Sequence, residues 1–207
     1  RVAKIDARIG RLPPEQRQGT VGREAYLSHI EDLVFGDDPR QGYTVGQAYY
    51  HPVLAFKLEF PEDWRIINQR QAVGGLSPNR DAAIVLTLSD KETPRAAFDA
   101  FFGQQGIQKG PNRGRNLFAF RAIDPETGYG RAEGLITFVN LDGRVYQLIG
   151  YTGLETWSSY GSTMQESMVT FRKVTDRRYL EVTPKTIDVV KLPRSMALAD
   201  FDKRYPS

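Results

Sequence analysis

The chain has no cysteine and only two histidines among its 207 residues. The absence of cysteine excludes disulfide bonds, thiolate catalysis and cysteine-ligated zinc. Zinc hydrolases need two imidazoles and usually a carboxylate around one ion, commonly presented as an HExxH motif on a helix. Here Ile-Glu-Asp-Leu follows His29, so that motif is absent. A composite site of His29, His51 and Asp37 is conceivable, but it has no sequence motif behind it.

We favour a structural interpretation of both imidazoles. His29 falls on the surface or boundary of a predicted helix. His51 opens an alternating segment, where its ring can hydrogen-bond a neighbouring backbone group while Pro52 fixes the start of the strand.

Long apolar runs and an excess of one charge are also missing. No segment approaches the 18 or more apolar residues of a membrane-spanning helix, so we expect no membrane insertion. The 28 Lys and Arg residues are mixed with 25 Asp and Glu residues. Nucleic-acid binding favours a basic face with exposed aromatics or a known module. We expect no nucleic-acid partner, because the densest basic group is spread over a predicted loop and two strands: Arg113, Arg115, Arg121 and Arg131.

Other catalytic patterns are equally sparse. The chain has no G-x-S-x-G motif, and its Gly-rich loops lack the lysine and following helix of a phosphate-binding loop. Three carboxylate pairs fall in predicted turns, where acids commonly serve solvation and capping: Asp37–Asp38, Glu62–Asp63 and Asp124–Glu126. The sequence therefore presents no self-contained active site, and whether the chain is an enzyme stays open.

The first third of the chain changes from helical to β patterning. Apolar spacing predicts a short helix within residues 1–18 and a second one within 22–36. Alternation and β-branched or aromatic residues then predict five strand segments: 43–50, 54–60, 64–69, 72–76 and 82–89. The tight connection between the last two predicts a hairpin.

The remainder mixes the two patterns. Thr93 and Pro94 predict the start of a helix that ends at Gly103 or Gly106. Residues 108–116 are polar and rich in Gly, Arg and Asn, which predicts a loop. The later elements are strands at 117–123, 130–140 and 144–152, a long helix at 154–171, a strand at 186–192 and a short helix beginning at Ser195.

Asp142-Gly143 is a strong hairpin signal between two of these strands. Most strand pairs are thus predicted to be antiparallel. The sequence predicts an α+β fold, with a mostly antiparallel sheet flanked by helices, N-terminal helices and a short C-terminal strand and helix.

The aromatic residues provide the candidate binding surface. At strand spacing most of them belong in a core, but one or two can line a groove between the sheet and a helix, where ligands commonly bind. The candidate groove residues are Tyr49, Tyr50, Trp64 and Trp157.

Three stretches carry a resemblance to a known family. The segment HPVLAFKLEFPEDWRIINQRQAVGGLSP, at 51–78, resembles the domain that follows the catalytic part of BepA-related zinc-dependent peptidases of the bacterial envelope. GREAYLSHIEDLVFGDDPRQG, at 22–42, resembles the link between those two parts. The tail from Thr170 resembles the end of the same proteins, where a LysM-like segment often closes the chain. The core around FPEDW is also similar to the PsbP-like fold.

The resemblance implies three segments: a helical linker at 1–42, a PsbP-like domain at 43–175 and a partial LysM-like segment at 176–207. No stretch matches the family's HExxH helix, so no catalytic residue is carried over and zinc is expected only in a separate catalytic domain. Arg1 in place of a methionine fits a processed product or a part of a longer protein.

The resemblance further implies a non-catalytic accessory domain of a secreted zinc peptidase, located in the periplasm or cell envelope. Such a domain positions a substrate or partner protein, and its partners include a protein or peptide and its own peptidase domain. A stand-alone PsbP-like module that binds a ligand or peptide is the alternative.

Overall fold

The computed structural model describes residue 13, residues 22–192 and residues 195–205. The chain divides into two compact units. The larger unit spans Asp37–Pro184, and the smaller unit contains the described residues before and after it. The helix predicted within residues 1–18 lies outside the described residues, apart from Pro13. None of the described helices has the length and apolar character needed to cross a bilayer.

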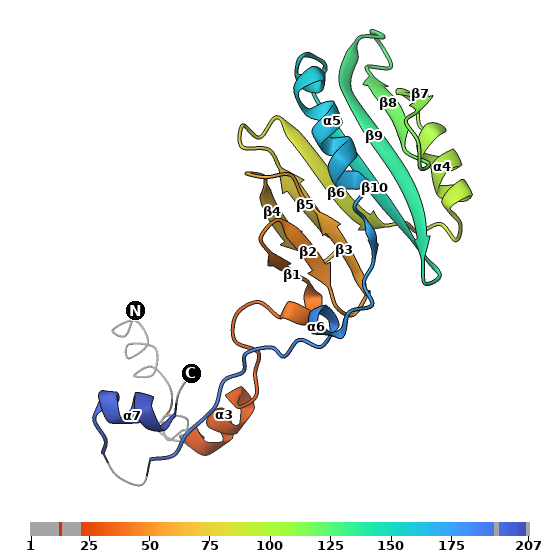
Figure 1. The fold of residues 1–207 in the computed structure, drawn as a ribbon. Helices are drawn as coiled ribbons and strands as arrows, with labels where there is room; N and C mark the ends of the chain where they lie inside the picture. Colours follow the sequence, from red (N-terminus) through yellow and green to blue (C-terminus); the bar gives the residue numbers. More distant parts are fainter. Residues whose placement is uncertain (1–12, 14–21, 193–194, 206–207) are drawn as a thin grey trace. The chain divides into compact units, whose positions relative to one another are not determined.

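The larger unit contains two antiparallel sheets (Figure 1). The small sheet has the order β1-β2-β3-β11 and the large sheet has the order β4-β5-β6-β10-β9-β8-β7. Their strands are β1 (Tyr43–Val45), β2 (Ala48–His51), β3 (Phe56–Glu59), β4 (Arg65–Gln69), β5 (Ala72–Leu76), β6 (Ala82–Leu88), β7 (Ile107–Asn112), β8 (Phe118–Ile123), β9 (Gly130–Leu141), β10 (Arg144–Thr152) and β11 (Arg172–Lys173). The predicted α+β class is confirmed, although the strands form two sheets instead of one.

The larger unit also contains short helices: η1 (Pro39–Gln41), α4 (Pro94–Phe102), η2 (Leu154–Thr156), α5 (Trp157–Met168) and α6 (Arg177–Leu180). Thr93 caps α4 as predicted, because its hydroxyl accepts a hydrogen bond from the Ala96 N–H at 3.1 Å. The predicted hairpins are also present. Asp142 and Gly143 both have positive φ between β9 and β10, and β5 pairs with β6.

The core lies on both faces of the large sheet. On one face, side chains of the large sheet pack with Tyr49, Phe56 and Leu58 of the small sheet and with Met164 and Met168 of α5. On the other face, α4 packs its buried residues against alternate residues of β8, β9 and β10. The small sheet and α5 therefore share one face, and α4 covers part of the opposite face (Figure 1).

Helix α5 is fastened to both sheets. Ser167 Oγ donates to the Glu59 carbonyl at 2.6 Å, and the Glu59 N–H donates to Thr170 Oγ1 at 2.8 Å. Strand β11 pairs only with Phe56 and Lys57 of β3 and does not reach Glu59. The Ser167 and Thr170 side chains therefore satisfy the backbone N–H and carbonyl of Glu59. On the large sheet, a Cβ placed at Gly150 would lie 3.0 Å from the Met164 sulfur. Glycine at that position permits the close approach of the helix.

The prediction of a loop over 108–116 is wrong for its first part, because residues up to Asn112 belong to strand β7. Residues 107–112 pair with β8 at the edge of the large sheet, with a register shift between Lys109 and Asn112. The polar, Gly- and Pro-containing composition that suggested a loop is acceptable at an edge, because one side of the strand needs no ladder partner. The loop proper follows β7.

The smaller unit contains α3 (Arg23–Ile30) and α7 (Leu198–Arg204). Its two chain segments run antiparallel, with an isolated bridge between Val34 and Thr186 and a 2.8 Å hydrogen bond from the Phe35 N–H to the Lys185 carbonyl. The predicted strand at 186–192 is reduced to this bridge, and α3 ends well before residue 36. The proposed segment limits at 42/43 and 175/176 stay predictions.

His51 lies at the end of β2 and accepts a hydrogen bond from the Leu54 N–H through Nδ1 at 3.3 Å. Its ring also lies 5.3 Å from the ring of Phe56. Burial lowers the pKa of His51 from its ordinary value of 6.5. The neutral imidazole therefore stabilises the turn between β2 and β3 by accepting the Leu54 N–H hydrogen bond.

The His51 pKa predicts a pH-dependent stability. Because the folded-state pKa lies below the unfolded value, the unfolded chain binds more protons below about pH 6.5, and the free energy of unfolding falls as the pH decreases. Denaturant unfolding between about pH 7.5 and 5.5 should show this loss, and His51→Gln should flatten the dependence. His29→Gln, in the smaller unit, is the matched control and should retain it. Identical slopes for the parent and His51→Gln would contradict the assignment.

Gly42 provides a second stability test. Its φ is +109°, and a Cβ at this position would overlap the Tyr49 hydroxyl. Gly42→Ala should therefore lower the free energy of unfolding by about 2 kcal/mol or more. Gly46→Ala is the control, because Gly46 also has a positive φ but no atom within 4 Å of the added Cβ, so a loss of only about 1 kcal/mol is expected. Equal losses in the two variants would show that the Tyr49 contact is unimportant.

Candidate functional site

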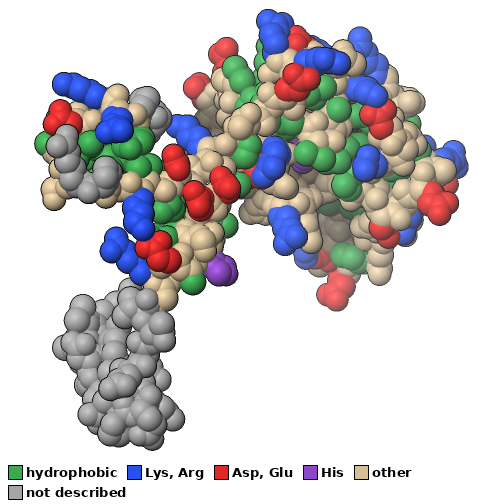
Figure 2. Space-filling view, turned by 90° about the horizontal axis from the view of Figure 1, so that it is seen from below, with side chains coloured by type: hydrophobic (Ala, Val, Ile, Leu, Met, Phe, Trp, Pro, Cys, Tyr) green, Lys and Arg blue, Asp and Glu red, His purple; other side chains and the backbone are tan. Residues whose placement is uncertain are grey.

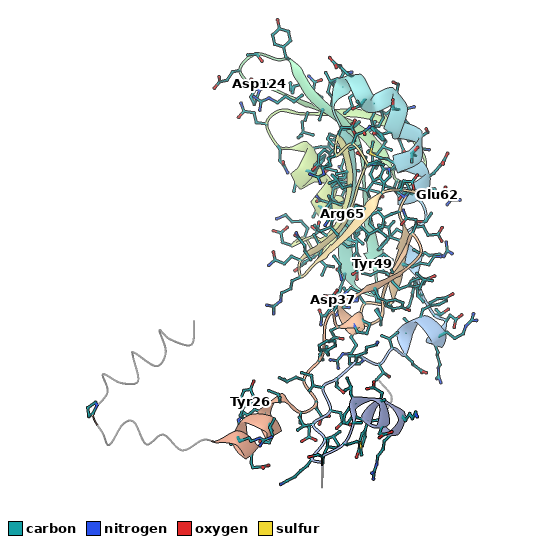
Figure 3. The ribbon with its side chains drawn as sticks, turned by 90° about the vertical axis from the view of Figure 1, so that its left-hand side faces the viewer. Tyr26, Asp37, Tyr49, Glu62, Arg65 and Asp124 are labelled. Atoms are coloured by element: carbon teal, nitrogen blue, oxygen red, sulfur yellow. The ribbon has the colours of Figure 1, made fainter. Side chains whose placement is uncertain are left out.

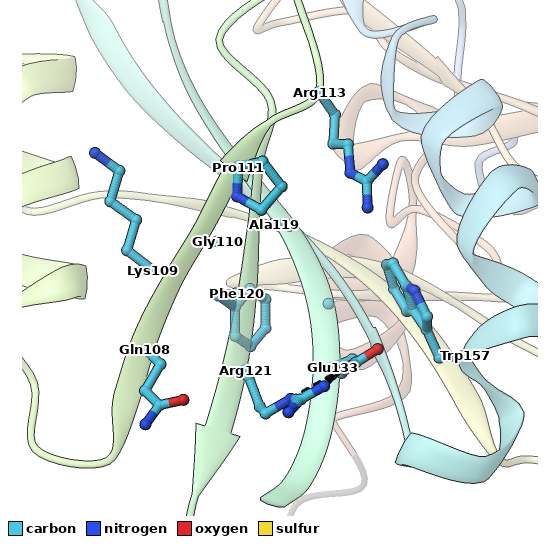
Figure 4. A pocket seen from close by; sticks show the side chains of 11 residues that line it. Gln108, Lys109, Gly110, Pro111, Arg113, Ala119, Phe120, Arg121, Glu133 and Trp157 are labelled. Carbon is cyan, nitrogen blue, oxygen red and sulfur yellow. Dashed lines mark hydrogen bonds and ion pairs between the residues drawn. The ribbon is translucent and has the colours of Figure 1, made fainter.

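An open hollow of about 260 Å³ lies between strands β7–β9 and the first turn of α5 (Figure 4). We call it the β7–α5 groove. It is lined by Gln108, Lys109, Gly110, Pro111, Arg113, Ala119, Phe120, Arg121, Glu133, Gly134 and Trp157. It is slightly smaller than the common range for small-molecule pockets, roughly 300–1,000 Å³.

The floor of the groove is formed by small residues. Gly110 of β7 and Ala119 of β8 lie next to each other, since a Cβ at Gly110 would be 3.0 Å from the Ala119 Cβ. Gly134 of β9 also borders the hollow, although a Cβ there would meet the Phe120 ring on the α4 side of the sheet. Larger side chains in this row would fill the space, so the hollow follows from the small residues at these positions.

Trp157 forms the wall opposite the strands (Figure 4). It is the first residue of α5 and is only half-buried. A Cβ at Gly161, one turn further along α5, would lie 3.1 Å from two atoms of the indole. Gly161 thus leaves room for the ring to lie along the helix, and the ring's open side is available for contact.

Charged side chains occupy one end of the groove. Arg121 of β8 donates from Nε to Glu133 Oε1 of β9 at 2.9 Å, directly across the two paired strands (Figure 4). Beyond it, Arg131 pairs with Asp124, whose side chain also accepts hydrogen bonds from the Thr127 and Glu126 N–H groups. These backbone hydrogen bonds, together with Arg131, lower the pKa of Asp124 to about 2.

Arg113 lies at the other end of the groove, on the loop that joins β7 to β8 (Figure 4). The loop is held by hydrogen bonds from the Arg113 N–H to the Leu117 carbonyl at 2.7 Å and from the Leu117 N–H to Gly114 at 2.8 Å. Leu117 is 2% exposed and anchors the loop in the core. Within the described part of the chain, no carboxylate forms an ion pair with Arg113.

The four predicted groove residues lie in different environments. Tyr49 is 1% exposed, its hydroxyl lies 3.0 Å from Asn68 Oδ1, and burial raises its pKa to about 12. Trp64 is also buried and packs edge-to-face on Tyr160. Of the four, Trp157 lines the groove.

Tyr50 is 7% exposed and points to the opposite face of the small sheet from Tyr49, where it is covered by other tyrosines. Its ring stacks on Tyr179 with centroids 4.3 Å apart and on Tyr43 at 5.6 Å. Burial is also the main cause that raises the Tyr50 pKa. A binding role for Tyr49, Tyr50 and Trp64 stays a prediction, and each has a packing role in this structure.

The polar residues considered for catalysis are dispersed. Asp37, Glu62 and Asp124, which represent the three carboxylate pairs, are well separated in the larger unit (Figure 3). His29 belongs to the smaller unit and His51 to the larger. Among residues 22–192 and 195–205, the structure shows no cluster of three His, Asp or Glu side chains suited to a metal ion.

The basic residues are also dispersed over the surface. The face of the larger unit seen in Figure 2 carries Lys and Arg side chains interspersed with Asp and Glu. Arg121 and Arg131 are each paired with an acid, as described above. The cluster considered in the sequence is therefore partly neutralised in the structure.

Arg113, Gly110, Ala119 and Glu133 were not identified as site residues from the sequence. The loop prediction hid the alternation of β7, which directs Gln108 and Gly110 to the groove face. The cross-strand pairing of Arg121 with Glu133 depends on a register that one sequence does not specify. Assigning 107–112 as an edge strand would have revealed the small-residue floor.

Comparisons with known proteins return no matching family model and no matching curated protein. Solved structures with a similar fold include the cyanobacterial PsbP of Synechocystis sp. PCC 6803, with 13% identity and a TM-score of 0.43 over 67% of this chain and 98% of that one. LpqN of Mycobacterium tuberculosis, involved in cell envelope biogenesis, has 16% identity and a TM-score of 0.41 over 58% and 83%. The Ran-binding protein Mog1p of Saccharomyces cerevisiae has 12% identity and a TM-score of 0.40 over 58% and 90%. Likenesses of this strength do not identify a function.

Proposed function

We propose that this chain is a non-catalytic binding module that holds a segment of a protein or peptide in the β7–α5 groove. The observation that carries the proposal is the half-buried Trp157 ring beside a floor of small residues, with the Arg113 guanidinium, which has no ion pair among the described residues, at one end. Tryptophan and arginine are the residues most enriched at binding hot spots, where an aromatic surface is combined with directed hydrogen bonds.

The shape of the groove favours a peptide. The hollow is open and shallow, so it can accept one or two side chains from a segment that continues across the surface. Its lining alternates apolar surface with hydrogen-bonding groups such as Gln108 and Arg121, which suits a polypeptide with exposed backbone amides.

Addition of the ligand as an extra strand on β7 is less favourable. Pro111 has no N–H to donate, and the register shift between Lys109 and Asn112 interrupts the edge. Lys109 also points to the α4 side, where its amino group lies 4.9 Å from the Phe98 ring centroid. The groove face, and not the strand edge, is therefore the proposed contact surface.

The family resemblance supports a more specific form of the proposal. In this form the module is an accessory domain of a zinc-dependent peptidase of the bacterial envelope, and it positions the substrate or a partner protein for a separate HExxH-containing domain. The genomic reading frame tests this form. An in-frame HExxH upstream of Arg1 supports it, whereas an export signal directly before Arg1 favours the stand-alone module.

The binding test uses the two tryptophans of the chain as reporters. Peptides selected from a random library should shift the indole N–H resonance of Trp157 in ¹⁵N NMR spectra and leave that of buried Trp64 in place. Trp157→Ala should weaken binding about tenfold or more, because it removes the aromatic wall. Tyr151→Ala removes an exposed aromatic outside the groove lining and serves as the control. Peptides that bind equally well to Trp157→Ala would place the binding surface elsewhere.

A further inference from the structure

The charged side chains around the groove differ in whether they already have a partner within the protein. Arg121 is held by Glu133, and Lys109 is directed to the rings of Phe98 and Phe118 on the opposite side of the sheet. Arg113 has no acidic partner in the described chain, and its loop is fixed by the buried Leu117. The backbone that carries Arg113 is thus held in place, and its exposed guanidinium has no ion-pair partner among the described residues.

Arg113 and Trp157 border the same hollow (Figure 4). The Gly110–Ala119 floor between them has no long side chain to separate a ligand from either residue. A guanidinium binds a carboxylate through two parallel hydrogen bonds, while an indole accepts an apolar or aromatic side chain. The two residues together match a ligand that carries both groups close to each other.

We infer that the β7–α5 groove recognises an acidic peptide segment, in which an Asp or Glu carboxylate pairs with Arg113 and a neighbouring apolar side chain contacts Trp157. This inference rests on the proposed function and adds its chemical specificity. The ligand is a peptide and not a nucleic acid, because a phosphate backbone needs a succession of unpaired cations. The described groove lining contains one arginine without an ion pair, Arg113, and at the opposite end a second arginine, Arg121, that is already paired.

Glu133 is the specificity-determining residue in this arrangement. Its carboxylate occupies Arg121 and adds a negative charge at the end of the groove away from Arg113. A ligand with one acid is therefore accepted at Arg113, whereas a second acid near Arg121 meets like charge. Glu133→Gln releases Arg121 and changes the preference toward ligands with two acids.

The test compares defined peptides by NMR titration of the Trp157 indole. Acetyl-Ala-Glu-Phe-Ala-amide should bind about tenfold more tightly than the same peptide with Gln in place of Glu. Arg113→Gln should abolish this difference. Arg115→Gln, on the same loop but outside the groove lining, is the matched control and should change the affinity by less than about twofold. Unchanged ¹⁵N spectra outside the groove confirm that the variants fold.

Glu133→Gln gives a second and opposite readout. It should increase the affinity for a peptide with two Glu residues by about threefold to tenfold, while the Gln peptide is unaffected. A merely structural role for the Arg121–Glu133 pair would weaken binding of all the peptides alike.

Any one of three outcomes would overturn the inference: equal binding of the Glu and Gln peptides at Trp157, a difference between them that persists in Arg113→Gln, or displacement of the Glu peptide by oligothymidylate. If library-selected peptides shift Trp157 but carry no excess of acids, the acidic specificity fails and the proposed binding function stands. If no selected peptide shifts Trp157, the proposed function fails as well.

Discussion

The close packing of α5 on the large sheet is the contact on which the arrangement of the larger unit depends. Met164 and Met168 reach the backbone of β10 because position 150 is glycine. At the far end of the helix, Ser167 and Thr170 satisfy the backbone of Glu59. The helix is thereby joined to both sheets, and its first residue, Trp157, is held beside β7–β9. A buried carbonyl or N–H left without these partners would cost on the order of 1–3 kcal/mol.

The groove combines two local properties of the sheet. Small residues on adjacent strands create the space, and charged residues at the strand ends determine the electrostatic character of its two ends. Glu133 neutralises Arg121 through direct cross-strand pairing, whereas Arg113, on the loop anchored by Leu117, has no ion-pair partner among the described residues. Because these elements belong to a hydrogen-bonded sheet and a core-anchored loop, little conformational entropy remains to be lost in the protein when a ligand binds.

Much of the fold could be predicted from local patterns. The alternation of β3, the Asp142-Gly143 turn and the Thr93 cap each depend on neighbouring residues only, and the structure contains all three. The division into two sheets depends on long-range pairing. Strand β7 forms because pairing with the neighbouring β8 overrides its polar local composition at the sheet edge. For the site, Trp157 was recognisable as a large aromatic residue on a helix. The groove residues on β7–β9 lie far from Trp157 in the sequence, so identifying them required knowledge of the strand pairing.

The tyrosine stack on the small sheet has a mechanical consequence. Tyr43 lies near the start of the larger unit and Tyr179 near its end, and the Tyr43 hydroxyl donates to the Tyr179 carbonyl at 3.2 Å. The entering and leaving segments are thus fastened together across Tyr50. A force that pulls the flanking segments apart would load the Val34–Thr186 bridge first and the tyrosine stack next, before it reaches the strands that carry the groove. The first and last segments of the larger unit are therefore expected to stay close to each other when the flanking segments move.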